Sequence, residues 1–191
     1  GYLHVGGLRT ALYNYLFAKK NGGAFILRIE DTDRSRFVPG AIESLITSLS
    51  QTGLAPDEGV FLENGILTQK GEYGPYIQSQ RTEIYKEHVA QLLASGNTYR
   101  CFCTKERLDE MRQKQTELKQ APMYDRRCLD LPQSEIEAKI ANGETYVIRQ
   151  KMPYETIKFK DLIRGNVQFD GKIIDDQVLM KSDGFPTYHL A

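Results

Sequence analysis

Apolar residues recur at helical spacing near the start of the chain. Leu8, Leu12 and Leu16 fall on one face and predict an amphipathic helix over residues 8–20. Asn21-Gly22-Gly23 should end this helix, because these residues tolerate the positive φ that a helix C-terminus often requires.

A short apolar run over residues 24–29 follows, with the length and character of a buried parallel strand. A second helix is expected over residues 39–49, because Pro39 fits a first helical position, and it should stop near Gly53. Helix, strand and helix joined by short connections indicate a doubly wound α/β sheet, in which a further strand should precede Gly1.

From Thr82 onward the pattern changes to a mixture of short strands and helices. Thr104 is a suitable N-cap for a charged helix that reaches about residue 119. Asp170-Gly171 is typical of a two-residue hairpin turn. The other expected elements are helices over residues 83–94 and 134–141 and strands over residues 98–103, 146–151, 156–160, 166–169 and 178–180.

This change of pattern predicts an inserted α+β domain. Residues 1–97 would form the first part of the doubly wound domain, residues 98–175 the insertion, and residues 176–191 the return to the first domain. A length of 191 residues suits one large domain that carries such an insertion.

Charge and cysteine content limit the classes of function. The 25 Lys and Arg residues equal the 25 Asp and Glu residues in number, so a nucleic-acid surface has to come from local clustering. The sequence has no apolar run long enough for a membrane span and opens on no signal-peptide pattern. Three cysteines cannot all pair in disulfides, which favours a reducing compartment such as the cytoplasm or an organelle matrix.

His4, Gly6 and Gly7 stand where the first predicted helix begins. A helix N-terminus attracts phosphate through its N–H groups and its partial positive charge, and glycine lets a ligand approach the backbone closely. A histidine there could donate to phosphate oxygens as charge builds on them. The alternative is an ordinary glycine turn with an incidental histidine.

Acidic residues follow the strand expected over residues 24–29. The carboxyl end of a strand in an open α/β sheet faces the ligand crevice, so Glu30 could pair with the ammonium group of a substrate. For Asp31 and Asp33 taken alone, the favoured interpretation is an acidic turn that caps a helix.

These blocks resemble a known family. Residues 1–7 are similar to the class I aminoacyl-tRNA synthetase signature in its H-x-G-G form, and residues 28–34 resemble the next block of glutamyl-tRNA synthetases. Residues 78–81, 147–151 and 179–191 resemble further blocks of that family in the same order. The resemblance covers essentially the whole chain.

The resemblance implies a Rossmann-like sheet of the HUP type with an inserted connective domain that binds the tRNA acceptor stem. It also implies a monomer that activates glutamate with ATP and Mg²⁺ and transfers it to the 3′ end of tRNA(Glu). By the same resemblance, ATP is assigned to His4, Gly6 and Gly7, glutamate to Glu30 and Tyr188, and the tRNA 3′ end to Asp33 and Arg36.

Several elements of the family's pattern fall outside residues 1–191. They are the arginine that neutralises the substrate side chain, a downstream asparagine, the lysine-rich loop and the anticodon-binding domain. Residues 1–191 alone are therefore expected to be inactive.

The cysteines form a candidate metal site. Cys101 and Cys103 should point to one face of a strand, and Cys128 follows the long charged helix, which could bring it back to them. Tyr124 or Asp130 could add the oxygen that completes the four ligands of zinc. The spacing resembles the zinc site in the insertion of some glutamyl-tRNA synthetases, and related enzymes use tyrosine at the Tyr124 position. The alternative is free thiols without a metal.

Basic residues are frequent in the predicted insertion. They could hold the acceptor stem through its phosphates. Basic residues that are scattered in this way more often form an ordinary solvent-exposed surface. They are Arg100, Arg112, Lys114, Arg126, Arg127, Arg149, Lys151, Lys158, Lys160 and Arg164.

Three alternatives to a glutamate–tRNA ligase stay open at this point. One is a glutamyl-queuosine tRNA(Asp) synthetase-like paralogue, against which Thr32 and the run 185–189 favour the full synthetase. Another is a small H-x-G-H nucleotidyltransferase, which Gly7 and the long insertion disfavour. The last is an RNA-binding module that has kept the fold without the chemistry.

Overall fold

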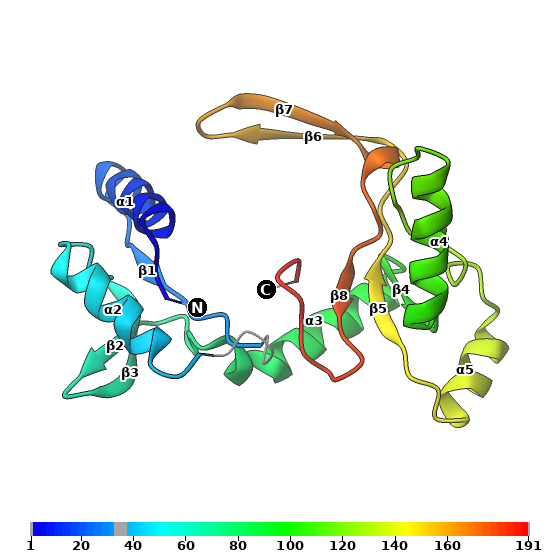
Figure 1. Cartoon of the computed structure of the whole chain (residues 1–191), viewed down its shortest axis with the longest axis horizontal. Helices are drawn as coiled ribbons and strands as arrows, with labels where there is room; N and C mark the ends of the chain where they lie inside the picture. Colours follow the sequence, from blue (N-terminus) through cyan, green and yellow to red (C-terminus); the bar gives the residue numbers. More distant parts are fainter. Residues whose placement is uncertain (1, 33–37, 191) are drawn as a thin grey trace. The chain divides into compact units, whose positions relative to one another are not determined.

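The computed structural model describes residues 2–32 and 38–190, and the chain divides into two compact units, Gly1–Thr82 and Glu83–Ala191 (Figure 1). Each unit has its own sheet and its own buried core. The three-part division at residues 97 and 175 stays a prediction. No helix in the described ranges is long and apolar enough to cross a membrane.

The first unit is built on a three-stranded mixed sheet. In this sheet β1 runs parallel to β2, and β2 pairs antiparallel with β3. Its elements are α1 (Val5–Lys20), β1 (Ile26–Leu27), α2 (Ala41–Gln51), β2 (Glu58–Glu63), β3 (Ile66–Lys70) and the 3-10 helix η2 (Gln78–Arg81).

Both helices expected in this unit are present. The first begins earlier than predicted, at Val5, because His4 supplies its N-cap. The second begins after Gly40 and stops before Gly53, and both glycines adopt the positive φ that side chains disfavour. The apolar run 24–29 is extended as predicted, although only part of it pairs as a strand.

A buried cluster of Ile29, Ile46, Val60 and Tyr76 forms the core of the first unit. By contrast, α1 has no fully buried side chain. It is fastened near its C-terminus by Lys19, whose Nζ lies 2.6 Å from Asp57 Oδ1.

The hairpin of β2 and β3 has no counterpart in the sequence-based prediction. Its turn is Asn64-Gly65, with φ of 52° and 78°. Positive φ at both central residues is the requirement of a type I′ turn, and Asn-Gly is its strongest sequence signal. The signal was therefore present in the chain at Asn64-Gly65.

The second unit contains a three-stranded antiparallel sheet in the order β4-β5-β8, and β6 and β7 form a separate ribbon (Figure 1). Two buried clusters lie in this unit, one around Tyr85 and Ile148 and one around Cys101 and Tyr124. Its elements are α3 (Thr82–Ala94), β4 (Thr98–Cys101), α4 (Lys105–Glu117), α5 (Gln133–Ala141), β5 (Val147–Gln150), β6 (Thr156–Asp161), β7 (Gly165–Asp170), the 3-10 helix η3 (Gly171–Ile173) and β8 (Val178–Met180).

The predicted hairpin turn at Asp170-Gly171 is wrong. The turn between β6 and β7 is formed by residues 162–164, where Asp161 Oδ1 accepts hydrogen bonds from two backbone N–H groups at 2.8 and 2.7 Å. Asp170 instead accepts from the backbone N–H of Lys172 at 3.0 Å and caps η3.

Gly171 serves close packing rather than a hairpin. A Cβ at this position would lie 2.0 Å from the carbonyl oxygen of Pro153. Glycine is required here because the chain crosses directly over another backbone segment, a contact that spacing along the sequence does not reveal.

Candidate functional site

The N-terminus of α1 is organised by His4. Its Nδ1 accepts hydrogen bonds from the backbone N–H groups of Gly6 at 3.1 Å and Gly7 at 3.3 Å. Because Nδ1 is the acceptor, the neutral ring carries its proton on Nε2. The imidazole therefore has one nitrogen fixed by the helix and one available as a donor.

Glycine leaves room for the His4 ring and for Leu3 at these two positions. A Cβ at Gly6 would lie 3.0 Å from Cε1 of His4, and a Cβ at Gly7 would lie 2.9 Å from Cδ1 of Leu3. The two N–H groups that the sequence assigned to a ligand are thus occupied by the histidine.

Glu30 lies just beyond the end of the apolar run, at an exposed position. Its backbone position is set by Ile29, whose N–H donates to the carbonyl of Tyr76 at 2.9 Å and whose carbonyl accepts from the N–H of Gln78 at 2.8 Å. The carboxylate of Glu30 pairs with Arg28, with 2.9 Å between Nη2 and Oε1. Glu30 and His4 belong to the same unit.

The contacts described for Asp31 are with Ser79 of η2, 48 residues further along the chain, and not with a helix that directly follows the acidic turn. Its carboxylate accepts from the N–H of Ser79 at 2.8 Å and from the hydroxyl of Ser79 at 2.6 Å, at the N-terminal end of η2. The acidic turn is therefore fastened to η2 within the first unit. Asp33 and Arg36, assigned to the tRNA 3′ end, lie outside the described residues.

Tyr188 belongs to the second unit. It follows β8 and is 71 % exposed, with its ring centroid 3.9 Å from that of His189. The chain here is held by the backbone N–H of Thr187, which donates to the carbonyl of Leu179 at 2.8 Å. The role of Tyr188 toward glutamate stays a prediction.

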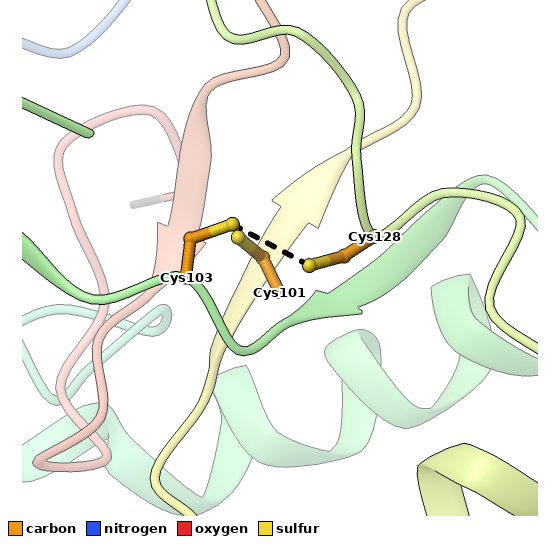
Figure 2. Close-up of side chains that lie close together, drawn as sticks. All are labelled: Cys101, Cys103 and Cys128. Carbon is orange, nitrogen blue, oxygen red and sulfur yellow. Dashed lines mark hydrogen bonds between the residues drawn. The ribbon is translucent and has the colours of Figure 1, made fainter. Parts of the chain in front are cut away.

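The three cysteines come together as the sequence predicted (Figure 2). The sulfurs of Cys101, Cys103 and Cys128 all lie within 4.8 Å of one another, and Cys103 Sγ is 3.6 Å from Cys128 Sγ. All three are free thiols. They come from the end of β4 and from the segment between α4 and α5.

Tyr124 completes the cluster with an oxygen. Its Oη lies 3.3 Å from the sulfurs of both Cys101 and Cys103 and accepts from the N–H of Cys128 at 3.1 Å. A tetrahedral zinc ion with bonds of about 2.3 Å to sulfur and 2.0 Å to oxygen spaces its ligands roughly 3.5–3.8 Å apart. The separations of 3.3 Å from the Tyr124 oxygen to two sulfurs and of 3.6 Å between Cys103 and Cys128 lie close to these values.

Asp130 is not part of this group of atoms. Its side chain is exposed. Among the described residues, the three cysteines are the members of the cluster, and no histidine or carboxylate belongs to it. Of the two oxygen ligands weighed from the sequence, the phenol of Tyr124 is the one beside the sulfurs.

Hydrogen bonds and burial within the cluster shift the pKa values of its side chains. A hydrogen bond from Cys128, assisted by Tyr124 and Arg149, lowers the pKa of Cys101 against the opposing effect of burial. The complementary hydrogen bond to Cys101, followed by burial, raises the pKa of Cys128. Burial raises the pKa of Tyr124. Cys101 thus ionises before Cys128, and the thiolate is the form that binds metals.

Two of the basic residues predicted to face RNA have other roles. Arg149 is only 4 % exposed, and its Nη1 donates to the carbonyl of Asp176 at 2.8 Å. Arg126 pairs with the carboxylate of Asp176 at 2.6 Å. These two arginines are held by a buried network rather than presented to solvent, while Lys158 and Lys160 on β6 stay exposed.

The chain belongs to the family of class I tRNA synthetases for E and Q, whose catalytic-domain description matches residues 1–191. It is 57 % identical over 193 residues to the glutamate–tRNA ligase of Clostridioides difficile and 55 % identical over 192 residues to that of Alkaliphilus metalliredigens. Both alignments cover all of this chain, which spans 39 % of the length of each relative.

Solved structures agree with the sequence relatives. A glutamate tRNA ligase from Elizabethkingia meningosepticum, crystallised in complex with its amino acid, gives a TM-score of 0.85 at 43 % identity. A glutamate-tRNA synthetase from Elizabethkingia anophelis gives 0.86 at 43 % identity. Each covers the whole of this chain, which corresponds to 38 % and 39 % of those chains. The predicted family and Rossmann-like fold class are confirmed.

Proposed function

We propose that this chain is the catalytic part of a glutamate–tRNA ligase, which activates glutamate with ATP and transfers it to the 3′ end of tRNA(Glu). Its main support is the geometry of His4, whose ring is fixed at the start of α1 with Nε2 as a donor. The names and the identity of the relatives support the choice of glutamate and tRNA.

The first step needs orientation and charge stabilisation more than a base, because a carboxylate is already a nucleophile at neutral pH. The α-carboxylate of glutamate attacks the α-phosphate of ATP, and pyrophosphate leaves. Nε2 of His4 donates to the α-phosphate as its charge rises, and the absence of side chains at Gly6 and Gly7 lets ATP approach. Mg²⁺ arrives with ATP as part of the substrate and neutralises the triphosphate charge.

The proposal assigns two residues to glutamate, Glu30 and Tyr188. The carboxylate of Glu30 takes the α-ammonium group and gives up Arg28, which costs little because exposed ion pairs contribute only about 0–1 kcal/mol. Tyr188 contacts the amino acid from the segment after β8. Asp33 and Arg36 contact the terminal adenosine of tRNA.

We further propose that one structural zinc ion is bound by Cys101, Cys103, Cys128 and Tyr124. The ion would cross-link β4 to the segment before α5, and closed four-ligand sites of this kind contribute directly to folding. Residues 98–175 would then act as the insertion that receives the acceptor stem, with Lys158, Lys160 and Arg164 toward its phosphates.

The test of the catalytic proposal is glutamate-dependent exchange between ATP and pyrophosphate in the complete enzyme, with tRNA(Glu) present. His4→Ala should lower this rate roughly 100-fold or more, as the loss of one transition-state donor typically does. His88→Ala, in α3 of the second unit, is the matched control and should leave the rate unchanged. Exchange that is unaffected by His4→Ala would remove His4 from the mechanism.

The same preparation separates the alternative functions. Transfer of glutamate to queuosine-containing tRNA(Asp) in preference to tRNA(Glu) would identify the paralogue. RNA binding without any exchange would identify a binding module.

The zinc proposal is tested by metal analysis and by ligand variants of the complete protein. About one equivalent of zinc is expected, and Tyr124→Phe should weaken its binding while Asp130→Asn should not. Equal stability with and without a chelator would establish free thiols instead.

A further inference from the structure

Arg149 is a buried cation on the central strand of the second unit's sheet. It lies on β5, between β4 and β8, and only 4 % of its surface is exposed. An arginine side chain stays protonated in proteins, and a buried charge is costly unless a counter-charge lies beside it. The structure should therefore contain a negative group facing this guanidinium.

Among the described residues, no carboxylate forms an ion pair with Arg149. Its Nη1 donates to the backbone carbonyl of Asp176, and its Nε has no hydrogen-bond partner in that part of the chain. The carboxylate of Asp176 is engaged elsewhere, with Arg126 at 2.6 Å and the Tyr99 hydroxyl at 2.7 Å. The residue whose carbonyl binds Arg149 thus has its carboxylate engaged with other donors.

The cysteine cluster is the group that faces Arg149. The guanidinium carbon lies 4.0 Å from the centroid of the Tyr124 ring, and the oxygen of that ring touches the sulfurs of Cys101 and Cys103. Arg149 also pairs with Tyr99 across the β4–β5 ladder. Cys101 lies two residues further along the same face of β4, within reach of a long side chain.

A second arginine beside the cluster is already neutralised. Nη1 of Arg107 lies 3.6 Å from Cys103 Sγ, but its Nη2 forms an ion pair with Asp125. Arg107 therefore adds a donor to the cluster without adding net charge.

Resting on the proposed zinc site, we propose that Arg149 is the counter-charge of that site and positions Tyr124 within it. When Tyr124 binds as the neutral phenol, three thiolates exceed the charge of one divalent ion by one unit, and the guanidinium supplies the balancing positive charge. By stacking on the Tyr124 ring, Arg149 also holds the phenol oxygen toward the sulfurs. The negative charge of the zinc-loaded site thus compensates the buried positive charge of Arg149, for which no ion pair is described within the sheet.

Two variants of the complete protein separate charge from packing. Arg149→Met keeps the volume and removes the charge, and we expect zinc affinity, measured by competition with a chromophoric chelator, to fall about 10- to 100-fold. Arg149→Lys keeps the charge and loses the planar stack, so its affinity should lie between those of Arg149→Met and the wild type.

Arg126→Met is the matched control. Arg126 contacts the carboxylate of Asp176 and the carbonyl of Met152, and it has no hydrogen bond to the sulfurs or to Tyr124 among the described contacts. Unfolding by denaturant is measured for each variant with and without zinc. Arg126→Met should lower the free energy of unfolding by the same amount with and without zinc. Arg149→Met should instead reduce the extra stability that zinc adds.

Cobalt substitution adds a readout of the site itself. The charge-transfer bands of cobalt bound to thiolates should shift in Arg149→Met and stay unchanged in Arg126→Met.

The proposal is overturned if Arg149→Met binds zinc as tightly as the wild type, or if Arg126→Met loses as much zinc affinity. Arg149→Lys and Arg149→Met with the same affinity would refute the role of charge. A wild-type protein that binds no zinc would refute both the zinc site and this inference. A metal-binding wild type with an insensitive Arg149 would refute the inference alone.

Discussion

Among the polar residues described in the second unit, Asp176 is expected to be the one whose substitution lowers the free energy of unfolding most. Its side chain is completely buried and accepts hydrogen bonds from Arg126 at 2.6 Å, from the hydroxyl of Tyr99 at 2.7 Å and from the backbone N–H of Met152 at 3.0 Å. Burial, and next the hydrogen bond to Asp176, raises the pKa of Tyr99, so its hydroxyl stays protonated and donates. Asp176→Ala would leave all three donors without this acceptor.

The cost of that change follows from the ion pair. Removing one partner of a buried pair typically costs about 3–5 kcal/mol, because the other charge stays buried and uncompensated. With a urea dependence of about 2 kcal/mol/M, the unfolding midpoint should fall by about 2 M. Asp176→Asn should cost less, since the amide keeps one acceptor oxygen for Arg126 and Met152.

The assay is urea unfolding followed by circular dichroism, with a chelator present so that metal does not contribute. Asp175→Ala is the matched control, because Asp175 accepts only from the backbone N–H of Tyr124, at 2.9 Å, among the hydrogen bonds described. Its loss should cost about 1 kcal/mol. If Asp176→Ala lowers the unfolding midpoint no further than Asp175→Ala, the buried ion pair with Arg126 does not carry the expected stability.

Two more stability predictions follow from single contacts. The hydrogen bond from Lys19, and next that from the N–H of Phe25, holds the pKa of Asp57 below its usual value of 3.8. The stability difference between the wild type and Asp57→Asn should therefore be constant at neutral pH and shrink as the pH falls below about 4. A difference that grows with acidity would contradict this sign. Gly171→Ala should destabilise the second unit by about 1–3 kcal/mol in the same urea assay, because its Cβ would lie 2.0 Å from the carbonyl oxygen of Pro153. Gly23→Ala controls for the change in residue type, since its Cβ would lie 3.6 Å from the nearest atom, the carbonyl oxygen of Ala18, and an equal effect of the two substitutions would exclude crowding as the cause.

Local signals in the sequence predicted the elements well. Thr104 caps α4 by accepting from the N–H of Arg107, as its residue type suggests. Gly53 and Gly143 follow helices with a positive φ. These features depend on backbone conformation within a few residues, so the sequence carries them directly.

Long-range contacts account for what the sequence could not predict. Arg149 resembles any other basic residue in the chain, and only the pairing of β5 with both β4 and β8 buries it. Asp176 stands in an acidic pair before an apolar strand, with no motif around it, and its partners are as distant as Tyr99. The cysteine cluster was predictable because the chemistry of cysteine limits its uses, although only the coordinates show that the oxygen of Tyr124, and not that of Asp130, lies beside the sulfurs.

The segment 123–128 is held by two separate sets of contacts. The sulfurs and the Tyr124 oxygen form one, and Asp175 and Asp176 form the other through the N–H of Tyr124 and the side chain of Arg126. Arg126 has a φ of 58°, a conformation that costs a non-glycine residue about 1–2 kcal/mol. Its buried ion pair with Asp176 offsets that cost. Asp175 and Asp176 thus hold the backbone of this segment through contacts that are separate from those among the sulfurs and the Tyr124 oxygen.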